Sequence, residues 1–293
     1  MLITIFTPTY NRAKTLPILY RSLCLQTCKD FEWLVVDDGS SDETESLIGN
    51  YKLQITNYVS SFEIRYIKQE NGGKHRAINR GVLEAKGELF FIVDSDDHLV
   101  PDAVEWICKY YEPVKNDTRF AGISGLRIHP DGTKIGGGSD FGVIDADAIE
   151  IRTKYHVKGD MAEVYRTEIL RQYPFPDFPG EKFCSEGLIW GRIAQKYKLR
   201  YFYHGIYVCE YLSGGLTDTR YSCRVNSPNY SMLLYSELIH HPNSLMGKVA
   251  YALNFWRFGM KSDKGFVEKC KQIGFPWFFL APVGLLMAKR LPK

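Results

Sequence analysis

Four short apolar runs alternate with helix-like segments along the first 115 residues of the chain. The runs cover residues 2–6, 31–36, 64–67 and 88–93, and their aromatic and β-branched residues are typical of buried strands. The segment after the first run carries Leu16, Leu19 and Leu23 at helical spacing. Strands that alternate with helices predict an α/β fold, a doubly wound and mostly parallel sheet with helices on both faces.

The pattern changes after about residue 115. Strands are expected at residues 120–128, 161–165 and 199–209, with a hairpin turn at Asp131 and Gly132. Residues 173–180 hold too many prolines for a helix or a central strand, whereas residues 186–197 form an amphipathic helical pattern. Beyond residue 220 the pattern is helical. We therefore expect an α/β domain over residues 1–220 and a helical extension over residues 221–293.

Polar residues follow three of the four predicted N-terminal strands, at residues 7–11, 37–42 and 94–97. The carboxyl ends of parallel strands meet at one edge of a sheet, where open α/β folds bind ligands. If residues 94–97 continue the extended strand, Asp94 and Asp96 lie on one side and Ser95 on the other. Two carboxylates on one side suit Mg²⁺ or Mn²⁺ that also holds a diphosphate. The alternative is an acidic turn that caps the next helix, and Asp97 fits that alternative.

Composition and charge exclude several other classes. A hydrophobic fraction of 45% and a charged fraction of 24% are those of a globular protein, and a net charge of +3 is too small to indicate nucleic acid as a partner. The seven cysteines show no paired zinc-ligand spacing, which predicts reduced, mostly buried thiols and a cytoplasmic protein. Residues 1–6 predict a strand and not a signal peptide. Neither a G-x-G-x-x-G turn nor a P-loop follows the first strand.

The order of these motifs resembles the family-2 glycosyltransferases. The resemblance is carried by Thr7-Pro8-Thr9-Tyr10-Asn11, Asp37-Asp38-Gly39-Ser40, Asn71-Gly72-Gly73 with Ala77 and Asn79, Gly87-Glu88, and Asp94-Ser95-Asp96-Asp97 with Pro101. It covers the first 110 residues well and extends more loosely to about residue 190. It implies the GT-A fold, with a nucleotide-sugar half over residues 1–115 and an acceptor half over residues 116–220. It also implies a nucleotide-diphosphate sugar donor, a divalent metal ion and inversion at the anomeric carbon.

The resemblance also assigns roles to individual residues. Asp96 is the expected ligand of Mn²⁺ or Mg²⁺, and Asp94 touches ribose or metal. Asp38 is expected to accept the imide N–H of uracil, although Asp37 and Asp38 also suit a helix N-cap. Lys74 and Arg76 either contact phosphate or face solvent. The full expected nucleotide-sugar site is Thr7, Pro8, Tyr10, Asn11, Asp38, Lys74, Asn79, Asp94 and Ser95.

Glu186 takes the place of the family's catalytic base. In the family this residue is usually an aspartate four residues before an aromatic side chain, and here Glu186 precedes Trp190 by four. Two departures are the longer glutamate and Ser185, which stands where a second acid is common. Glu186 otherwise serves only as an acid in the first turn of a helix. Glu181 and Asp177 are the alternative bases.

The resemblance predicts transfer of a UDP-hexose or UDP-N-acetylhexosamine sugar to a saccharide hydroxyl. The acceptor is expected to be linked to polyprenyl diphosphate, in bacterial capsule, exopolysaccharide or O-antigen synthesis at the inner face of the cell membrane. Two alternatives stay open: a non-catalytic nucleotide-sugar-binding protein, and transfer to a protein acceptor. A nucleotidyltransferase is disfavoured because residues 7–11 lack a Gly-rich basic loop.

The C-terminal segment predicts a membrane surface as a further partner. Residues 275–288 are uncharged, but a spanning helix needs about 20 residues and two prolines interrupt this run. Lysines 261, 264, 269 and 271 precede it, and Lys289, Arg290 and Lys293 follow it. Aromatic side chains beside basic ones suit an anionic bilayer interface. The alternative is a tail that packs on the catalytic domain and completes a core.

Overall fold

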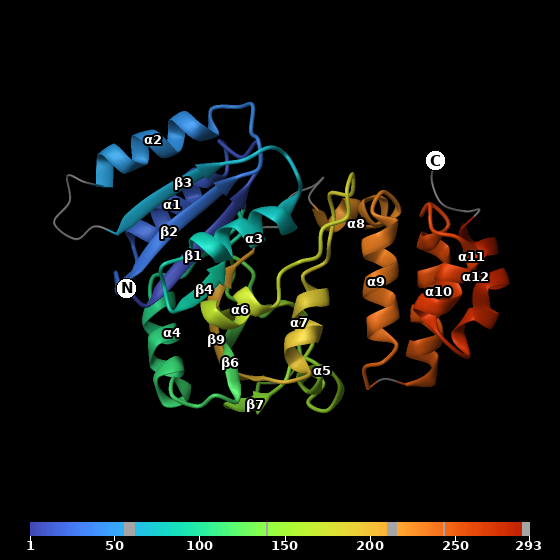
Figure 1. Cartoon of the computed structure of the whole chain (residues 1–293). Coiled ribbons are helices and arrows are strands. Elements are labelled where there is room, and N and C mark those ends of the chain that lie inside the picture. The colour runs from blue at the N-terminus through green and yellow to red at the C-terminus, as the bar shows by residue number, and fades with distance from the viewer. Residues whose placement is uncertain (56–61, 139, 210–215, 243, 289–293) are drawn as a thin grey trace. The chain divides into compact units, whose positions relative to one another are not determined.

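The computed structural model of the chain describes residues 1–55, 62–138, 140–209, 216–242 and 244–288. Within these residues nine strands form one mixed sheet, in the order β3-β2-β1-β4-β8-β6-β9-β5 with β7 paired to β9 (Figure 1). The strands are β1 (Ile3–Thr9), β2 (Phe31–Asp37), β3 (Glu63–Lys68), β4 (Leu89–Ile92), β5 (His98–Leu99), β6 (Phe120–Ile128), β7 (Ile144–Ala146), β8 (Met161–Arg166) and β9 (Lys198–Val208).

The helices fall into two groups along the chain. Those that alternate with the strands are α1 (Leu16–Cys24), α2 (Thr44–Ile55), α3 (Lys74–Glu84), α4 (Ala103–Tyr111), the short 3₁₀ turn η1 (Glu112–Val114), α5 (Glu150–Thr153), α6 (Thr167–Gln172) and α7 (Gly187–Ala194). Those of the C-terminal region are α8 (Leu216–Val225), α9 (Pro228–Leu238), α10 (Leu245–Gly259), α11 (Phe266–Ile273), η2 (Trp277–Leu280) and α12 (Ala281–Ala288).

The chain divides into two compact units, which are described separately below. The first comprises Met1–Pro174 and Ile193–Tyr211, and the second comprises Phe175–Arg192 and Leu212–Lys293. The first unit contains the whole sheet, and the second contains the helices beyond residue 220. The proposed functional boundaries at residues 115 and 220 stay predictions.

The N-terminal half of the sheet confirms the predicted α/β fold. Strands β1, β2, β3 and β4 are parallel to their neighbours, and helices connect them. The second half is more mixed than the sequence predicts, because β8 inserts antiparallel between β4 and β6. Since β8 reverses direction on both sides, β6 runs the same way as β4, and β9 runs parallel to β6. The carboxyl ends of β1, β2, β4, β6 and β9 therefore lie at one edge.

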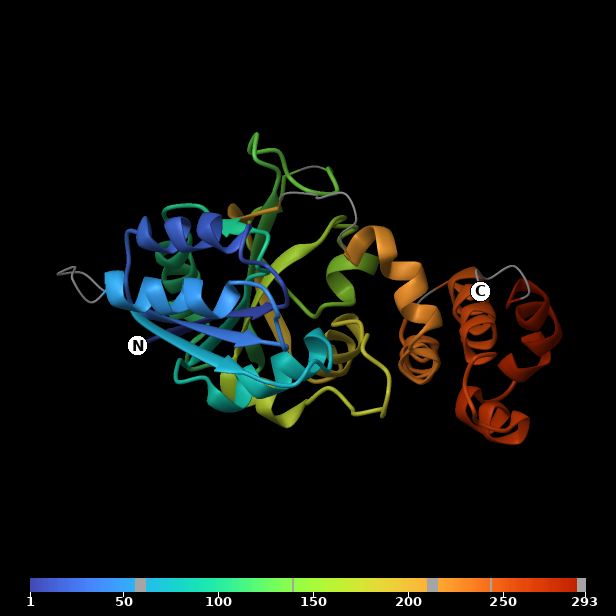
Figure 2. The same ribbon diagram turned by 90° about the horizontal axis from the view of Figure 1, so that it is seen from above.

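Helices cover both faces of the sheet, and Figure 2 shows α1 and α3 on opposite sides of the strands. On one face, Ile5 and Trp33 pack in a cluster that includes residues from α1, α2 and α4. On the other face, the rings of Phe6 and Phe90 stack with centroids 4.9 Å apart, below α3. A Cβ on Gly81 would lie 2.2 Å from the Phe6 ring, so glycine allows α3 to approach this face closely.

The first strand is longer than the sequence predicts. It continues through Pro8 to Thr9, in register with β2 as far as Asp37, although a loop was expected from residue 7. Pro8 is tolerated because the main-chain N–H and C=O groups of alternate residues in a strand point to opposite neighbouring strands. Phe6 accepts a hydrogen bond from Val93 on the β4 side, and β4 ends before it reaches Pro8. The missing N–H of Pro8 therefore faces a side without a ladder partner in the described sheet.

The helical C-terminal region is confirmed, and its last segment is part of a core. The indole nitrogen of Trp256 donates to the Trp277 carbonyl oxygen at 3.2 Å, and Ala281 is 2% exposed. A Cβ on Gly284 would lie 2.4 Å from the Trp256 Cβ, so α12 packs closely on α10 within the second unit. Among the described residues, no helix combines the length and the apolar character needed to cross a bilayer.

The cysteines differ from the expectation in burial. All seven are free thiols, as predicted, but Cys184 and Cys209 are buried whereas Cys24 is exposed and the others are half-buried. Cys24 is the last residue of α1 and lies at the surface. The thiols therefore contribute packing at a few positions and no cross-link.

Candidate functional site

The aspartates after β4 form a tight turn at the carboxyl edge of the sheet. The Asp97 N–H donates to the Asp94 carbonyl oxygen at 3.1 Å, so this segment is not the extended strand that the sequence predicts. The predicted alternation of exposure nevertheless holds. Ser95 and Asp97 are 6% and 8% exposed, whereas the side chains of Asp94 and Asp96 are each 25% exposed. The turn thus presents the two candidate ligands and buries the residues between and after them.

Two cations face the exposed carboxylates. Lys74, the first residue of α3, places its Nζ 2.6 Å from Asp94 Oδ1, and Arg12 Nη2 lies 3.9 Å from Asp96 Oδ2. Burial raises the pKa of Asp94, but the charges of Lys74, Arg127 and Arg12 outweigh it and hold the pKa below its usual value. Lys74 thus pairs with Asp94, and its contact with a donor phosphate stays a prediction.

Asp97 does not cap the following helix, as one alternative expected. Asp102 occupies the N-cap of α4, while Asp97 Oδ2 accepts a 2.7 Å hydrogen bond from the hydroxyl of Tyr207. Burial, with the charges of Asp94 and Asp96, raises the pKa of Asp97 to about 6. Asp97 is thus a buried carboxylate on the inner side of the turn.

Three residues at this edge of the sheet were not predicted from the sequence: Arg12, Arg127 and Tyr207. Arg127 is the last residue but one of β6, and its guanidinium carbon lies 4.3 Å from the centroid of the Tyr207 ring. Burial and the charge of Asp94 raise the pKa of Tyr207 well above its usual value, so its hydroxyl keeps the proton. Arg12 could have been found from the sequence, because it directly follows the Tyr10-Asn11 motif. Arg127 and Tyr207 could not, because they meet only through the pairing of β6 with β9.

The carboxylates of this turn fit a divalent cation. In the described residues the closest cation to Asp96 is Arg12 at 3.9 Å, and both side chains of this pair are partly exposed. Magnesium and manganese use one or two protein carboxylates together with phosphate oxygens of a substrate. Across the described residues no cluster of three or more histidine, cysteine or acidic side chains is arranged for a metal ion. The turn therefore offers the one or two carboxylates that Mg²⁺ or Mn²⁺ takes from a protein, and not a complete set of protein ligands.

Asp38 clamps the loop that follows β3. Its carboxylate accepts hydrogen bonds from the Gly72 N–H at 2.9 Å, the Gly73 N–H at 2.7 Å, Gln69 Nε2 at 2.8 Å and Asn71 Nδ2 at 3.1 Å. A carboxylate offers about four acceptor sites. A uracil imide N–H would therefore share an oxygen with a loop donor, and base recognition by Asp38 stays a prediction.

The clamp predicts a large effect of Asp38→Asn on stability. The new amide nitrogen is a donor and faces two former donors, in a residue that is 4% exposed. We expect a loss of about 2–3 kcal/mol in the free energy of unfolding, measured by urea denaturation. Asp131→Asn is the matched control, because Asp131 also accepts from its own turn but is exposed; it should change stability by less than about 0.5 kcal/mol. Equal stability of the two variants would contradict the clamp.

Thr7 and Pro8 lie within β1 and are buried. Thr7 is 0% exposed, and its Oγ1 accepts a 3.0 Å hydrogen bond from the Trp33 indole. This contact ties Thr7 to the core beneath the sheet. Contact of these two residues with a nucleotide stays a prediction, which their burial does not favour.

The next two residues of the motif lie at the surface. Tyr10 is 49% exposed, and its stacking on a base stays a prediction. Asn11 adopts a positive φ of 53°, and its N–H donates to Ser40 Oγ at 2.8 Å while its Oδ1 accepts from the Ser41 N–H at 2.8 Å. Asn11 therefore joins the loops after β1 and β2. Asn79 is half-buried on α3, and its predicted sugar contact is likewise untested.

The candidate base lies in the second unit, at the start of α7. The Glu186 carbonyl oxygen accepts from the N–H groups of Ile189 and Trp190 at 2.9 and 3.1 Å, so Glu186 opens this helix as the sequence predicts. Its side chain is half-buried, as is that of Trp190. The position of Glu186 at the start of α7 is compatible with a catalytic base and equally with an acid that only stabilises the helix start. The catalytic assignment stays a prediction.

One of the alternative bases has a structural task. Glu181 is 6% exposed, and its carboxylate accepts from the Asn229 N–H at 2.8 Å and the Tyr230 N–H at 3.0 Å. N–H groups in the first turn of a helix have no acceptor within the helix, so Glu181 caps α9 from a distance in sequence. Asp177 is exposed in the proline-rich segment. Glu181 is accordingly the weakest of the three as a base.

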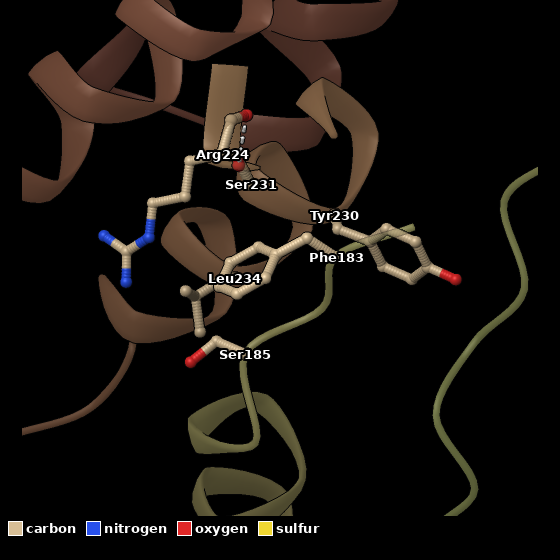
Figure 3. A pocket seen from close by; sticks show the side chains of 6 residues that line it. All are labelled: Phe183, Ser185, Arg224, Tyr230, Ser231 and Leu234. Atoms are coloured by element: carbon tan, nitrogen blue, oxygen red, sulfur yellow. Dashed lines mark hydrogen bonds between the residues drawn. The ribbon is translucent and has the colours of Figure 1, made fainter. Parts of the chain in front are cut away.

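The segment before Glu186 borders a small hollow in the second unit. The hollow is shallow and is lined by Phe183, Ser185, Arg224, Tyr230, Ser231 and Leu234 (Figure 3). Ser231 Oγ donates to the Arg224 carbonyl oxygen at 3.0 Å and joins α8 to α9 at this point. Ser185 thus lines a hollow at the α8–α9 corner.

Comparisons with known proteins agree with this architecture. The chain is 34% identical over 141 residues to chondroitin synthase of Pasteurella multocida, which covers 48% of this chain and 14% of that protein. It is 35% identical over 105 residues to the glycosyltransferase GlyG of Streptococcus pneumoniae, covering 36% of this chain and 33% of GlyG. The chain thus spans between a seventh and a third of the length of these relatives.

Solved structures share the fold at low sequence identity. S. aureus TarS 1-349 in complex with UDP-GlcNAc superposes with a TM-score of 0.62 at 20% identity, over 100% of this chain and 82% of that one. The mannosyltransferase PcManGT of Pyrobaculum calidifontis, in complex with GDP-Man and Mn²⁺, gives a TM-score of 0.56 at 17% identity over 98% and 80% of the two chains. The fold is therefore GT-A, as predicted.

The sequence model of one family matches more than half of the chain. Residues 4–158 match the model described as glycosyl transferase family 2. This range contains the strand-end loops, the clamp of Asp38 and the carboxylate turn. With this match, and with the GT-A architecture around it, the chain belongs to glycosyl transferase family 2.

Proposed function

We propose that this protein is an inverting, metal-dependent glycosyltransferase that moves a sugar from a UDP-sugar to a hydroxyl of a saccharide. The observation that carries the proposal is the turn of residues 94–97, which presents two carboxylates beside Lys74 and Arg12 at the carboxyl edge of a GT-A sheet. Family membership supports sugar transfer from a nucleotide sugar. TarS with bound UDP-GlcNAc supports a UDP-linked N-acetylhexosamine or hexose as the donor.

The residues of the turn divide the work of donor binding. Asp96, together with Asp94, would hold Mn²⁺ or Mg²⁺, which supplies positive charge to the leaving diphosphate. Lys74 and Arg12 already lie beside these carboxylates and can turn to the phosphates when the acids acquire another partner. Tyr10 offers an exposed ring to the base. The chain's own cations thus hold the donor diphosphate from the side of α3 and of the loop after β1.

Inversion requires a base that takes the proton of the acceptor hydroxyl as the hydroxyl attacks the anomeric carbon. We assign this role to Glu186, which opens α7 four residues before Trp190. The hydroxyl oxygen forms the new glycosidic bond, the bond to the diphosphate breaks, and the proton passes to a Glu186 carboxylate oxygen. No covalent intermediate with the protein is needed for a single inverting displacement.

A donor panel tests the proposal and its alternatives. Purified protein is incubated with UDP-glucose, UDP-galactose, UDP-GlcNAc, UDP-GalNAc and UDP-glucuronate, with and without Mn²⁺, and UDP release is measured. Slow release from one donor, dependent on Mn²⁺, supports the transferase. Binding without release, with or without saccharide acceptors, favours a nucleotide-sugar-binding protein. Release that only a protein acceptor accelerates favours the protein-directed alternative, and no binding of any donor refutes all three.

We propose, second, that the C-terminal helices attach the enzyme to an anionic membrane, at the inner face of the cell membrane, where a polyprenyl-diphosphate-linked acceptor resides. One side of this segment packs on α10, but Phe275, Phe279, Val283 and Leu286 are 78%, 67%, 48% and 62% exposed. The rings of Phe275 and Phe279 are 6.2 Å apart, and Val283 and Leu286 share a face of α12 by their spacing. Lys261 and Lys271 are exposed nearby in the sequence, while Lys289, Arg290 and Lys293 lie outside the described residues.

The membrane proposal predicts that Phe279→Asp with Leu286→Asp weakens binding to liposomes with anionic lipids by about 10-fold or more, because two apolar side chains leave the interface and two negative charges face it. Sedimentation with liposomes measures this effect. Removal of residues 274–293 is a poor test, since Ala281 and Trp277 belong to the core of the second unit. Leu53→Asp is the matched control, because Leu53 is 70% exposed on α2. Unchanged liposome binding of the double variant would refute the attachment.

A further inference from the structure

Tyr207 joins both ends of the carboxylate turn through one hydroxyl group. The Asp94 N–H donates to Tyr207 Oη at 2.9 Å, and Tyr207 Oη donates to Asp97 Oδ2 at 2.7 Å. The side chain is 0% exposed, so water does not compete freely for these bonds. Asp96 lies between the two anchored residues, and the turn is closed by the hydrogen bond from the Asp97 N–H to the Asp94 carbonyl oxygen.

The ring of Tyr207 is itself held in place. The guanidinium of Arg127 lies 4.3 Å from the ring centroid, and Arg127 Nε donates to the Met161 carbonyl oxygen at 2.9 Å. The ring of Phe91 makes an edge-on contact with the Tyr207 ring, with the centroids 6.1 Å apart. Arg127 of β6 and Phe91 of β4 thus contact the ring, a carbonyl group of β8 holds Arg127, and the hydroxyl has a fixed position relative to the sheet.

We propose that Tyr207 is a positioning residue that fixes the direction of the Asp94 and Asp96 carboxylates toward the metal and diphosphate of the donor. This inference rests on the proposed function for the identity of the ligand. A turn without this anchor would keep its internal hydrogen bond but could rotate about residues 93 and 97. Fixing the main chain at residue 94 and the side chain at residue 97 removes that freedom and leaves the two ligand side chains outward.

The anchor is separate from the pairing that holds the strand. Leu99 and His98 pair antiparallel with Tyr207 and Val208, so the main chain of β9 keeps residues 98–99 in register without the hydroxyl. Tyr207→Phe retains the ring, its contact with Arg127 and this ladder. The substitution therefore removes only the link to the turn, and the sheet is expected to form.

The first test uses the protein without metal or nucleotide. Hydrogen–deuterium exchange of the peptide that contains residues 93–97 is compared in the wild type and in Tyr207→Phe. Loss of the acceptor for the Asp94 N–H should raise the exchange rate in this peptide by about 10-fold or more, while peptides of β1 and β2 keep their protection. Tyr201→Phe is the matched control, since Tyr201 is 1% exposed on the same strand and pairs with Ser124 and Ile144 rather than with the turn.

The second test measures UDP binding by calorimetry over a range of Mn²⁺ concentrations. Loss of a residue that orients metal ligands typically costs 10–100-fold in metal affinity, so the Mn²⁺ concentration for half-maximal UDP binding should rise by that factor in Tyr207→Phe. Metal-free UDP affinity and the far-UV circular dichroism spectrum should not change. A merely structural tyrosine would lower stability without shifting the Mn²⁺ dependence.

The outcomes separate this inference from the proposed function. Faster exchange with a shifted Mn²⁺ dependence supports the positioning role. Unchanged exchange, or faster exchange with an unshifted Mn²⁺ dependence, overturns it. If the wild type itself shows no Mn²⁺-dependent UDP binding, the proposed function fails, and the inference that Tyr207 orients metal ligands fails with it. Exchange would then still report whether the hydroxyl restrains the turn.

Discussion

Glu186→Gln is expected to keep donor affinity and to slow sugar transfer by about 10²-fold or more, the usual effect of losing a general base. Glutamine has nearly the same shape as glutamate, but its amide does not accept the proton of the acceptor hydroxyl. The backbone of Glu186 opens α7 through bonds to Ile189 and Trp190, and the substitution leaves these bonds intact. Transfer is measured with the donor that the panel identifies, and donor affinity is measured by calorimetry with UDP and Mn²⁺.

Variants of two neighbouring acids serve as controls for this experiment. Asp177→Asn changes an exposed acid of the same segment and should leave transfer within about 3-fold of wild type if Glu186 is the base. Glu181→Gln should lower stability, because Glu181 caps α9 through Asn229 and Tyr230, and any loss of activity should follow the loss of folded protein. If Glu186→Gln transfers sugar at the wild-type rate, Glu186 is only an acid at the start of a helix, and Asp177 becomes the next candidate for the base.

The fold was predictable where the hydrophobic pattern is decisive. The first, second and fourth strands are buried on both faces and are mostly apolar, and their order with helices implies a parallel sheet. The end of β1 was not predictable from Pro8, because the tolerance of a proline depends on where the neighbouring strand β4 ends. The antiparallel insertion of β8 also depends on pairing between distant segments, which no local periodicity reports.

The candidate site was predictable only in part, for a similar reason. Asp94 and Asp96 stand out because they follow a buried run, and their exposure agrees with the expectation although the turn geometry does not. Asp38 shows the limit of a motif: its position is the expected one, but its carboxylate is occupied by Gln69 and the loop after it. Tyr207 lies 113 residues beyond Asp94, so their contact exists only in the folded sheet.

Asp96→Ala is expected to abolish the metal-dependent part of UDP binding. The affinity in saturating Mn²⁺ should fall to the metal-free value, by about 100-fold or more, because the exposed carboxylate of the turn is lost while the substrate phosphates alone hold the ion weakly. The fold should persist. The described ion pair of Asp96 is a 3.9 Å contact with Arg12 between partly exposed side chains, which contributes less than about 1 kcal/mol.

The sign of the effect without metal distinguishes a lost ligand from a damaged protein. Removing the negative charge of Asp96 should leave metal-free UDP affinity unchanged or raise it. The diphosphate then still meets both cations, Arg12 and Lys74, but is repelled by one carboxylate fewer. A misfolded variant would bind UDP more weakly under both conditions. Asp102→Ala is the control, since this nearby carboxylate accepts from the Trp106 indole at 2.8 Å and should not alter Mn²⁺ dependence. Equal UDP affinity of Asp96→Ala and wild type in Mn²⁺ would show that Asp96 is not a metal ligand. Any effect of Tyr207→Phe on the Mn²⁺ dependence of UDP binding would then have to act through Asp94 alone.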